Sequence, residues 1–508
     1  MKNKESSGID GISNKLLKIA KNQITKPVTL IINQMIKTGI FPDKLKISRV
    51  TPIYKANKKD QFSNYRPISL LPSLSKIFEY VIYDQLSLYF IDNRLLSPQQ
   101  YGFRPKHSTE LAALNLIDQL TYKLDQNKIP INIYLDLSKA FDTLNHEIII
   151  KKLRYYGVTN IELKLIANYL SQRTQIVEFN KCQSDPQIIK AGVPQGSILG
   201  PLLFSIYIND LPTCTDWFKL IMYADDTTLC CDINKDGSSD CAINNELVKI
   251  TNWLASNQLS LNANKTKYMV FHFDKKRLTY PHLLINNINI DRVDYFNFLG
   301  LIIDHNLKWK KHKEHISSKV CKTIGILRRL KHEYPQHTLL TLYNTLILPH
   351  FNYCILSWGS ECDPIHKYQK RALRIITDSK YRAHTEPLCK TLNLLKIQDI
   401  YQLAIFKFYH KLINSGLPHY FEDFTPIFSH GNEHYNFRNP SRQIPRHKHE
   451  FPKQSLRYNL VTTLNHSQPE LLDMAITLSI KNYTMYIKNS ILNEYNMTCE
   501  LENCFICQ

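Results

Sequence analysis

Apolar residues follow helical spacing near both ends of the chain and mix with strand-like runs between them. Residues 1–48 place apolar side chains at helical intervals and end at Gly39 and Pro42, which are helix-stop signals. Short strands and helices are predicted from residue 49 to about 304, and an almost wholly helical region follows over 308–412. This mixture predicts an α+β protein.

The C-terminal part of the chain has a different pattern. Residues 417–452 are rich in Pro, His, Asn and Ser, which predicts a loop. A final helix is predicted over 470–495. The pattern as a whole divides the chain into a helical N-terminal extension, a mixed region, a helical region, and a linker with a C-terminal tail. These predicted units are 1–48, 49–304, 305–412 and 413–508.

Two adjacent aspartates, Asp225 and Asp226, lie between the short apolar runs 220–222 and 227–230. This arrangement predicts a β-hairpin with both carboxylates at its tip. Neighbouring carboxylates repel each other, so their placement between strands favours binding of divalent cations. An ordinary Asp-rich turn has the same local pattern.

A third carboxylate, Asp136, ends the strand-like run 131–135. Strands that are far apart in sequence can pair in one sheet, and such pairing would bring Asp136 beside Asp225 and Asp226. Three carboxylates can hold two Mg²⁺ ions about 3.5–4 Å apart for an in-line phosphoryl displacement. The pattern therefore indicates a nucleotidyl-transfer site.

Charge points to a polyanionic partner. The 508 residues include 64 Lys and Arg against 44 Asp and Glu, a formal net charge of +20, as expected for a protein that binds phosphate backbones. A lysine-rich codon bias would also raise this charge. Basic helix faces recur in the helical region, at Lys319, Lys322, Arg328, Arg329, Lys367, Lys370, Arg371 and Arg374, and solvated helix faces have the same appearance.

The cysteines and histidines give weaker signals. The twelve cysteines are scattered, and with no secretory signal or long apolar stretch they predict reduced thiols in an intracellular protein without a membrane segment. Cys499, Cys504 and Cys507 could begin a zinc site, but a structural zinc needs four ligands and a reduced tail is favoured. His312 and His315 are expected to be solvated, because their spacing does not place them on one helix face.

Six motifs occur in order along the chain: NYRPISLL at 64–71, YGFRP at 101–105, LDLSKAFD at 135–142, AGVPQGS at 191–197, YADD at 223–226 and FLG at 298–300. Such an ordered set is far more specific than any one motif. With these motifs the chain resembles the reverse transcriptases of non-LTR (LINE-type) retrotransposons, most closely the jockey group, over roughly residues 8 to 376.

The resemblance implies a right-hand polymerase fold, with fingers and an antiparallel palm sheet over 49–304, a helical thumb and connection over 305–412, and a helical C-terminal region. It implies an RNA-directed DNA polymerase that copies retrotransposon RNA by two-metal nucleotidyl transfer, primed from a nicked target. The implied cofactors are two Mg²⁺ ions, or Mn²⁺, held by Asp136, Asp225 and Asp226. The implied partners are an RNA template, a DNA primer or target, and dNTPs, with steps in nucleus and cytoplasm.

The same resemblance implies roles for substrate-binding residues. Phe141 corresponds to the aromatic residue beneath the incoming sugar, which excludes a 2′-hydroxyl, although a core Phe at the start of a helix is an alternative. Gln195 and Gly196 are expected to line the nucleotide and template pocket, with a plain strand-to-helix turn as the alternative. Lys55 and Arg104 are expected to bind the triphosphate.

Three further assignments complete the expected site. Lys265 is expected to protonate the departing pyrophosphate as a general acid, and Lys267 is the alternative. Arg66 is expected to contact template or to brace the fingers. The motif 298–300, formed by Phe298, Leu299 and Gly300, corresponds to a primer grip, where a tight turn presses the backbone against the primer end.

Two other functions compete with this reading. A domesticated or decayed copy would keep the fold and RNA affinity without catalysis, but the complete set of motif residues argues against it. An RNA-templated RNA polymerase would share the metal site, and Phe141 argues against it. In relatives an endonuclease domain usually precedes such a chain, so we expect this chain to be part of a longer element.

Overall fold

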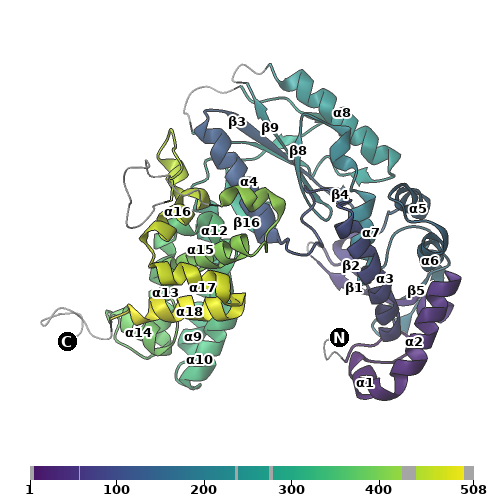
Figure 1. The fold of residues 1–508 in the computed structure, drawn as a ribbon, viewed down its shortest axis with the longest axis horizontal. Coiled ribbons are helices and arrows are strands. Elements are labelled where there is room, and N and C mark those ends of the chain that lie inside the picture. The colour runs from purple at the N-terminus through teal and green to yellow at the C-terminus, as the bar shows by residue number, and fades with distance from the viewer. Residues whose placement is uncertain (1–4, 56–57, 235–237, 274–278, 426–441, 497–508) are drawn as a thin grey trace, which may run out of the picture.

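The computed structural model describes residues 5–55, 58–234, 238–273, 279–425 and 442–496. Figure 1 shows an arch in which N-terminal helices and the strands β1 (Ile47–Tyr54) and β2 (Tyr65–Leu70) form one limb and C-terminal helices form the other. The strands β3 (Ile129–Leu135), β8 (Lys219–Tyr223) and β9 (Asp226–Ile233) lie where the limbs meet. None of the helices in the described ranges is long and apolar enough to cross a membrane.

The first helices form as the apolar spacing predicts. Helix α1 (Asn14–Ile19) is followed by α2 (Lys21–Thr38), which ends at Gly39 with φ of 67°, a left-handed position that glycine adopts without strain. The next turn buries Phe41 completely, edge-on to Tyr169 at 5.1 Å between ring centroids. The N-terminal segment is thereby packed against the fingers.

The strands of the fingers form a separate sheet in the order β2-β1-β5-β6. Strand β1 pairs antiparallel with β2 and parallel with β5 (Thr174–Phe179). The hairpin between β1 and β2 carries the first motif, so the fingertip is a two-stranded extension of this sheet. The remaining elements here are β6 (Cys182–Gln183), β7 (Gln187–Ile188), α3 (Ser73–Asp92), α5 (His146–Tyr155) and α6 (Asn160–Leu170).

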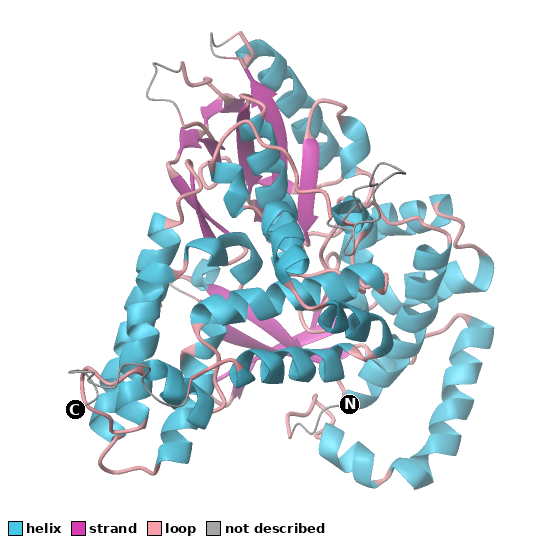
Figure 2. Ribbon diagram, turned by 60° about the vertical axis from the view of Figure 1, so that its left-hand side comes forward, coloured by secondary structure: helices cyan, strands magenta, loops and turns pink. Residues whose placement is uncertain are grey.

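The palm sheet has the order β14-β11-β3-β9-β8, and Figure 2 shows strands in separate groups with helices around them. All seven residues of β3 are buried, which explains its continuous apolar pattern, because a central strand covered on both faces needs no polar alternation. Helix α4 (Thr109–Asp125) packs against β3 and β8. The other palm elements are β4 (Leu137–Ser138), α7 (Leu199–Tyr207), α8 (Asp240–Ser256), β10 (Ser260–Leu261), β11 (Lys267–Val270), β12 (Leu284–Ile285), β13 (Ile288–Asn289) and β14 (Asp291–Arg292).

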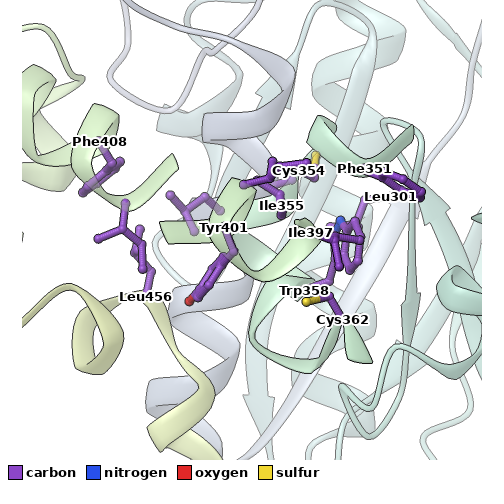
Figure 3. Packing of buried hydrophobic residues seen from close by; sticks show 14 of the residues in the cluster. Leu301, Phe351, Cys354, Ile355, Trp358, Cys362, Ile397, Tyr401, Phe408 and Leu456 are labelled. Carbon is purple, nitrogen blue, oxygen red and sulfur yellow. The ribbon is translucent and has the colours of Figure 1, made fainter. Parts of the chain in front are cut away.

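A two-stranded hairpin, β15 (Tyr295–Phe298) and β16 (Leu301–Asp304), precedes the helical limb. One buried apolar cluster runs from α4 through β16 into the C-terminal helices. Figure 3 shows its centre, where Trp358, Cys362 and Ile397 lie together near Leu301 and Phe351. The helices are α9 (Lys310–Leu330), α10 (Gln336–Leu346), α11 (Leu348–Asn352), α12 (Ile355–Trp358), α13 (Asp363–Ile376), α14 (Thr385–Thr391) and α15 (Ile397–Ile413).

The C-terminal region differs from the pattern-based expectation. The predicted final helix is two helices, α17 (Pro469–Thr477) and α18 (Ile480–Asn493), because the chain is extended between them and Ser479 caps α18 through its side chain. Helix α16 (Leu456–His466) was not predicted. The predicted loop contains a 3₁₀ helix, His419–Phe424, whose buried Phe side chains pack against Phe408.

The expectation that His312 is solvated is wrong. Its side chain is buried on α9, its Nδ1 accepts a hydrogen bond from the Ile302 N–H at 3.3 Å, and its ring lies edge-on to Trp358. Burial lowers the pKa of His312 to about 4. His315 is exposed as expected. The spacing of residues along a helix does not show which side other elements cover, and here β16 and Trp358 cover the side of α9 that carries His312.

Candidate active site

Asp225 and Asp226 lie at the turn between β8 and β9, as the flanking apolar runs predict. Tyr223 pairs with Asp226 to close the turn, and Ala224 has φ of 56°. Strand β9 also pairs with β3, with Leu135 opposite Thr227. The next residue after Leu135 is Asp136, so this register brings Asp136 out of the sheet beside Asp226.

The pKa shifts show that the three carboxylates interact. Burial raises the pKa of Asp225, and the charge of Asp136 raises it further. Burial and then the charges of Asp225 and Asp136 raise the pKa of Asp226 to about 6. No salt bridge to Asp225 or Asp226 is formed within the described ranges. The repulsion between these groups is thus left for another cation to relieve.

The three aspartates are suited to a divalent cation by chemistry and position. Carboxylate oxygens are the ligands that Mg²⁺ and Mn²⁺ prefer, and mutual repulsion is what a bound cation would offset. The described part of the chain contains no group of three or more His, Cys, Asp or Glu side chains already placed to hold a metal ion. The Asp136, Asp225 and Asp226 assignment as metal ligands therefore stays a prediction.

Lys265 lies beside Asp136, with 3.9 Å between its Nζ and the carboxylate Oδ2, and most of its side chain is exposed. The segment that carries it is fixed to the end of β3, because the Asn262 N–H donates to the Asp136 carbonyl at 2.9 Å. Lys267, the alternative, is instead paired with Asp291 at 2.7 Å. The structure therefore favours Lys265 over Lys267 as the lysine near the carboxylates.

The PQG loop is held between two other motifs. The Gln195 side chain donates to Asp142 Oδ1 at 2.8 Å, and its carbonyl accepts from the Ser69 N–H at 2.8 Å. Gly196 has φ of 128°, and a Cβ there would lie 2.7 Å from the Ser69 carbonyl oxygen, so a larger residue cannot be accommodated without a shift. Asp142 belongs to the motif LDLSKAFD, but the sequence does not predict that it is the hydrogen-bond partner of Gln195.

Phe141 lies in a turn that precedes α5, not at the start of that helix as the alternative expected. Its ring stacks on Phe204 of α7 at 4.6 Å and faces Phe103 edge-on at 6.3 Å. The side chain is half-buried. Phe141 is thus both a packing residue and accessible from one side, and its sugar-gate role stays a prediction.

Arg104 makes contacts that differ from the expected triphosphate clamp. Its Nη1 donates to the carbonyls of Ser97 at 2.5 Å and Gln100 at 3.3 Å, and burial lowers the pKa of its guanidinium. These bonds brace the turn before the YGFRP motif. Nη1 of Arg104 thus has a supporting role, and the triphosphate-binding role of this residue stays a prediction.

The fingertip residues Lys55 and Arg66 act on the carboxylates from the other side. The positive charge of Lys55 opposes the upward pKa shifts of both Asp225 and Asp226, and that of Arg66 opposes the shift of Asp225. Both residues belong to the β1–β2 hairpin region, far earlier in the chain. The fold thus places two basic side chains within electrostatic reach of the β8–β9 hairpin, an arrangement that would suit the binding of a triphosphate.

The expected primer-grip motif forms the turn between β15 and β16. Phe298 pairs with Leu301, and Leu299 and Gly300 have φ of 49° and 91°, so this is a tight two-residue turn with both central residues left-handed. The Tyr353 hydroxyl donates to the Leu299 carbonyl. The hairpin is anchored to the palm by Phe296, whose ring stacks on Tyr134 at 3.8 Å.

Comparison with known proteins identifies the domain. Residues 56–303 match the family model described as "Reverse transcriptase (RNA-dependent DNA polymerase)". The matched stretch is a reverse transcriptase domain. Enzymes of this family are nucleotidyltransferases that typically use divalent metal ions, and the expected α+β polymerase fold is confirmed.

Named relatives agree with the expected retrotransposon group. The chain is 29% identical over 418 residues to the probable RNA-directed DNA polymerase from transposon BS of Drosophila melanogaster, covering 78% of this chain and 45% of the relative. It is 24% identical to the RNA-directed DNA polymerase from mobile element jockey of the same species, covering 80% and 46%. The chain thus spans about half the length of the relatives it matches.

Solved structures match at lower similarity. A telomerase from Candida tropicalis, solved in complex with a fragment of telomeric RNA, is 12% identical with a TM-score of 0.39, and the match covers 79% of this chain and 68% of the telomerase chain.

The cysteines that could begin a zinc site, Cys499, Cys504 and Cys507, lie outside the described residues. The nine cysteines within the described ranges are free thiols.

Proposed function

We propose that this reverse transcriptase chain copies retrotransposon RNA into DNA by metal-assisted transfer of nucleotides from dNTPs to a DNA primer end at the target. The observation that carries the proposal is the convergence of Asp136, Asp225 and Asp226 at one edge of the palm sheet. The three negative charges repel one another in the free protein. Divalent cations bound by the carboxylates would offset this repulsion.

The chain's own residues supply the remaining parts of the reaction. Asp136, Asp225 and Asp226 would hold divalent cations, which when bound lower the pKa of a primer 3′-hydroxyl and neutralise the leaving pyrophosphate. Lys55 and Arg66 would attract the triphosphate towards the hairpin. Lys265 would give a proton to the departing pyrophosphate from its exposed position beside Asp136.

Template and primer would lie in the arch between the two limbs. Helix α9 presents exposed basic side chains at Lys319, Lys322, Arg328 and Arg329, which suit contact with a phosphate backbone. The β15–β16 turn would support the primer end, since Tyr353 fixes its backbone. The net charge of +20 supports nucleic-acid binding over the whole surface.

The test is primer extension by the purified chain on an oligonucleotide-primed RNA template with dNTPs and Mg²⁺. We expect product from the wild type and none from Asp225→Ala. Asp473→Ala, which removes an exposed carboxylate from α17, is the matched control and should extend normally. Both variants should bind RNA with wild-type salt dependence, because affinity resides in the distributed basic surface.

The alternatives predict different results. A folded wild-type chain that binds RNA but extends neither DNA nor RNA primers would favour the decayed, RNA-binding copy. Better extension of an RNA primer with rNTPs than of a DNA primer with dNTPs would favour an RNA polymerase. Equal extension by the wild type and Asp225→Ala would remove the metal assignment.

Phe141 provides a separate test of sugar selection. Phe141→Val removes the ring but keeps a branched apolar side chain against Phe204, so the ratio of rNTP to dNTP incorporation should rise by about 10-fold or more. Steady-state incorporation of each nucleotide measures the ratio. An unchanged ratio would leave Phe141 as a packing residue of the turn.

A further inference from the structure

We infer that Gln100 is a positioning residue that sets the backbone of the catalytic hairpin through its side-chain oxygen. This inference rests on the proposed function, because it concerns where Asp225 and Asp226 are held. Gln100 lies directly before the YGFRP motif, and its side chain is completely buried. It forms no part of the carboxylate set itself.

The Gln100 side-chain oxygen bridges two backbone segments. It accepts hydrogen bonds from the Gly102 N–H at 2.7 Å and from the Ala224 N–H at 3.2 Å. Because both partners are N–H donors, the amide orientation is determined, with the oxygen towards the hairpin. The amide nitrogen Nε2 is buried and has no hydrogen-bond partner within the described ranges, so Gln100 keeps an unsatisfied donor to maintain this contact.

The turn at Ala224 needs such support. Ala224 has φ of 56°, a left-handed conformation that is strained for a residue other than glycine. Such a conformation persists where surrounding contacts fix it. The Gln100 oxygen binds the N–H of this residue, immediately before Asp225, and therefore acts on the peptide whose orientation determines where the two carboxylates point.

Gly102 closes the same contact from the other side. A Cβ on Gly102 would lie 2.4 Å from the Ala224 nitrogen, so the two backbones touch and only glycine allows the approach. The Tyr101 N–H adds a hydrogen bond of 2.7 Å to the Met222 carbonyl. Residues 100–102 thus form a rigid support against the inner side of the hairpin.

The neighbouring Gln99 offers a matched comparison within the same segment. Its side-chain oxygen also accepts from a strand backbone, the Leu220 N–H at 2.8 Å. Leu220 lies earlier on β8, away from the turn. Gln99 and Gln100 therefore make the same kind of bond to the same strand, and they differ in whether the bond reaches the turn that carries the aspartates.

The experiment compares Gln100→Met with Gln99→Met in the full chain. Methionine keeps the length and volume of glutamine but cannot accept the N–H bond well. For Gln100→Met we expect the Mg²⁺ concentration for half-maximal primer extension to rise about 10- to 100-fold. Gln99→Met should lose similar thermal stability and leave that concentration unchanged. Affinity for primed RNA should be the same in both variants.

Two readouts do not depend on activity. Titration of Mn²⁺ alone, followed by electron paramagnetic resonance, should show weaker binding to Gln100→Met than to Gln99→Met. Hydrogen exchange measured by mass spectrometry should be faster over residues 223–226 in Gln100→Met alone. Gly102→Ala is a second variant, whose Cβ would lie 2.4 Å from the Ala224 nitrogen and 3.0 Å from the Gln100 side-chain oxygen. It should reproduce both changes if Gln100→Met folds poorly.

The outcomes separate this inference from the proposed function. Equal Mg²⁺ dependence, Mn²⁺ binding and hydrogen exchange in Gln100→Met and Gln99→Met would overturn the positioning role even if the wild type extends primers. Absence of extension by the wild type would overturn the proposed function, while weaker Mn²⁺ binding and faster exchange in Gln100→Met would still support the positioning role.

Discussion

Two sets of carboxylates lie on the palm, and they differ in whether other side chains or backbone groups of the chain pair with them. At the β8–β9 turn, Asp225 and Asp226 face each other's charge and that of Asp136, without a salt bridge of their own in the described ranges. On α4, Asp118 and Asp125 are more deeply buried but are fully paired with the C-terminal region.

The pairs on α4 join the C-terminal limb to the palm. Asp118 accepts both hydrogen bonds from Arg457 Nε, at 2.9 and 3.0 Å, and one from the Tyr420 hydroxyl at 2.7 Å. Asp125 accepts from the backbone N–H groups of Lys448 and His449. These two aspartates lie seven residues apart and so share one helix face.

The comparison teaches how to separate function from architecture in a highly charged protein. A buried carboxylate with a complete set of donors is explained by the contact it makes. At the hairpin, the charge of Asp136 raises the pKa of Asp225, and the charges of Asp225 and Asp136 raise that of Asp226. No salt bridge of Asp225 or Asp226 in the described ranges offsets this repulsion, so the group marks a site where a ligand is expected. Four predictions follow from this difference, in decreasing order of effect.

The largest effect is expected for Asp136→Ala. Primer extension should fall by at least about 1000-fold, because one of three cation-binding carboxylates is lost. The free energy of unfolding should not fall, since the substitution relieves repulsion on Asp225 and Asp226. Extension kinetics and urea unfolding measure the two quantities. Substantial residual extension by Asp136→Ala, or a marked fall in its free energy of unfolding, would show that Asp136 has a structural role like that of Asp118 and Asp125.

Asp118→Ala should do the reverse. It leaves Arg457 and Tyr420 without their buried partner, so the free energy of unfolding should fall by about 3 kcal/mol. Asp473→Ala on exposed α17 should change it by less than about 0.5 kcal/mol. Urea unfolding provides the measurement, and extension by the folded fraction should persist. If Asp118→Ala matched the control, the proposed junction between limb and palm would be wrong.

His312 is a buried titratable side chain that is uncharged at neutral pH, in contrast to the buried carboxylates. Its folded pKa of about 4 lies below the ordinary value of 6.5, so its contribution to stability is present above pH 6.5 and is lost as the pH falls to 4. The loss should reach about 3 kcal/mol. His312→Gln should remove this acid sensitivity and the exposed His315→Gln should not, when unfolding is measured at pH 7.5, 5.5 and 4.5. Identical pH profiles would contradict the assignment.

The smallest effect is expected for Asp226→Asn in metal-free buffer. The folded pKa is raised from 3.8 to about 6, so the cost of the charged form grows as the pH rises from 3.8 and is complete above 6. The neutral amide should therefore stabilise the protein by about 1 kcal/mol at pH 7.5, a reduced figure because the side chain is exposed and screened by solvent. The gain should shrink as the pH falls below 6 and vanish below 3.8, where the carboxyl is protonated in both the folded and the unfolded chain. A gain independent of pH would have another cause.

Local sequence patterns predicted the elements that carry the candidate site. The apolar runs around Asp225 and before Asp136 predicted β8, β9 and β3, because strand alternation and chain reversal depend on neighbouring residues. The motif order predicted the reverse transcriptase family. The C-terminal helices were less predictable, since α16 has a weakly periodic pattern and the break at Ser479 depends on a cap within a continuous apolar run.

Contacts between distant segments were not predictable in the same way. Arg104 was expected at the triphosphate, but its bonds to the Ser97 and Gln100 carbonyls depend on how the 97–104 turn closes. The roles of Asp142 and Gln100 depend on partners at Gln195 and Ala224. Asp142 is the last residue of one motif and Gln100 directly precedes another, and that position was the sole signal in the sequence for either residue.

The sequence by itself determined the class of protein and the hairpin that carries Asp225 and Asp226, and it predicted a divalent cation as their ligand, because these follow from residue type, motif order and local periodicity. The tertiary structure decided which carboxylates are paired and which repel, that Lys265 and not Lys267 lies beside Asp136, and that His312 is buried. The physical reason is that burial and charge interaction depend on distances between segments, and packing of the whole chain sets those distances.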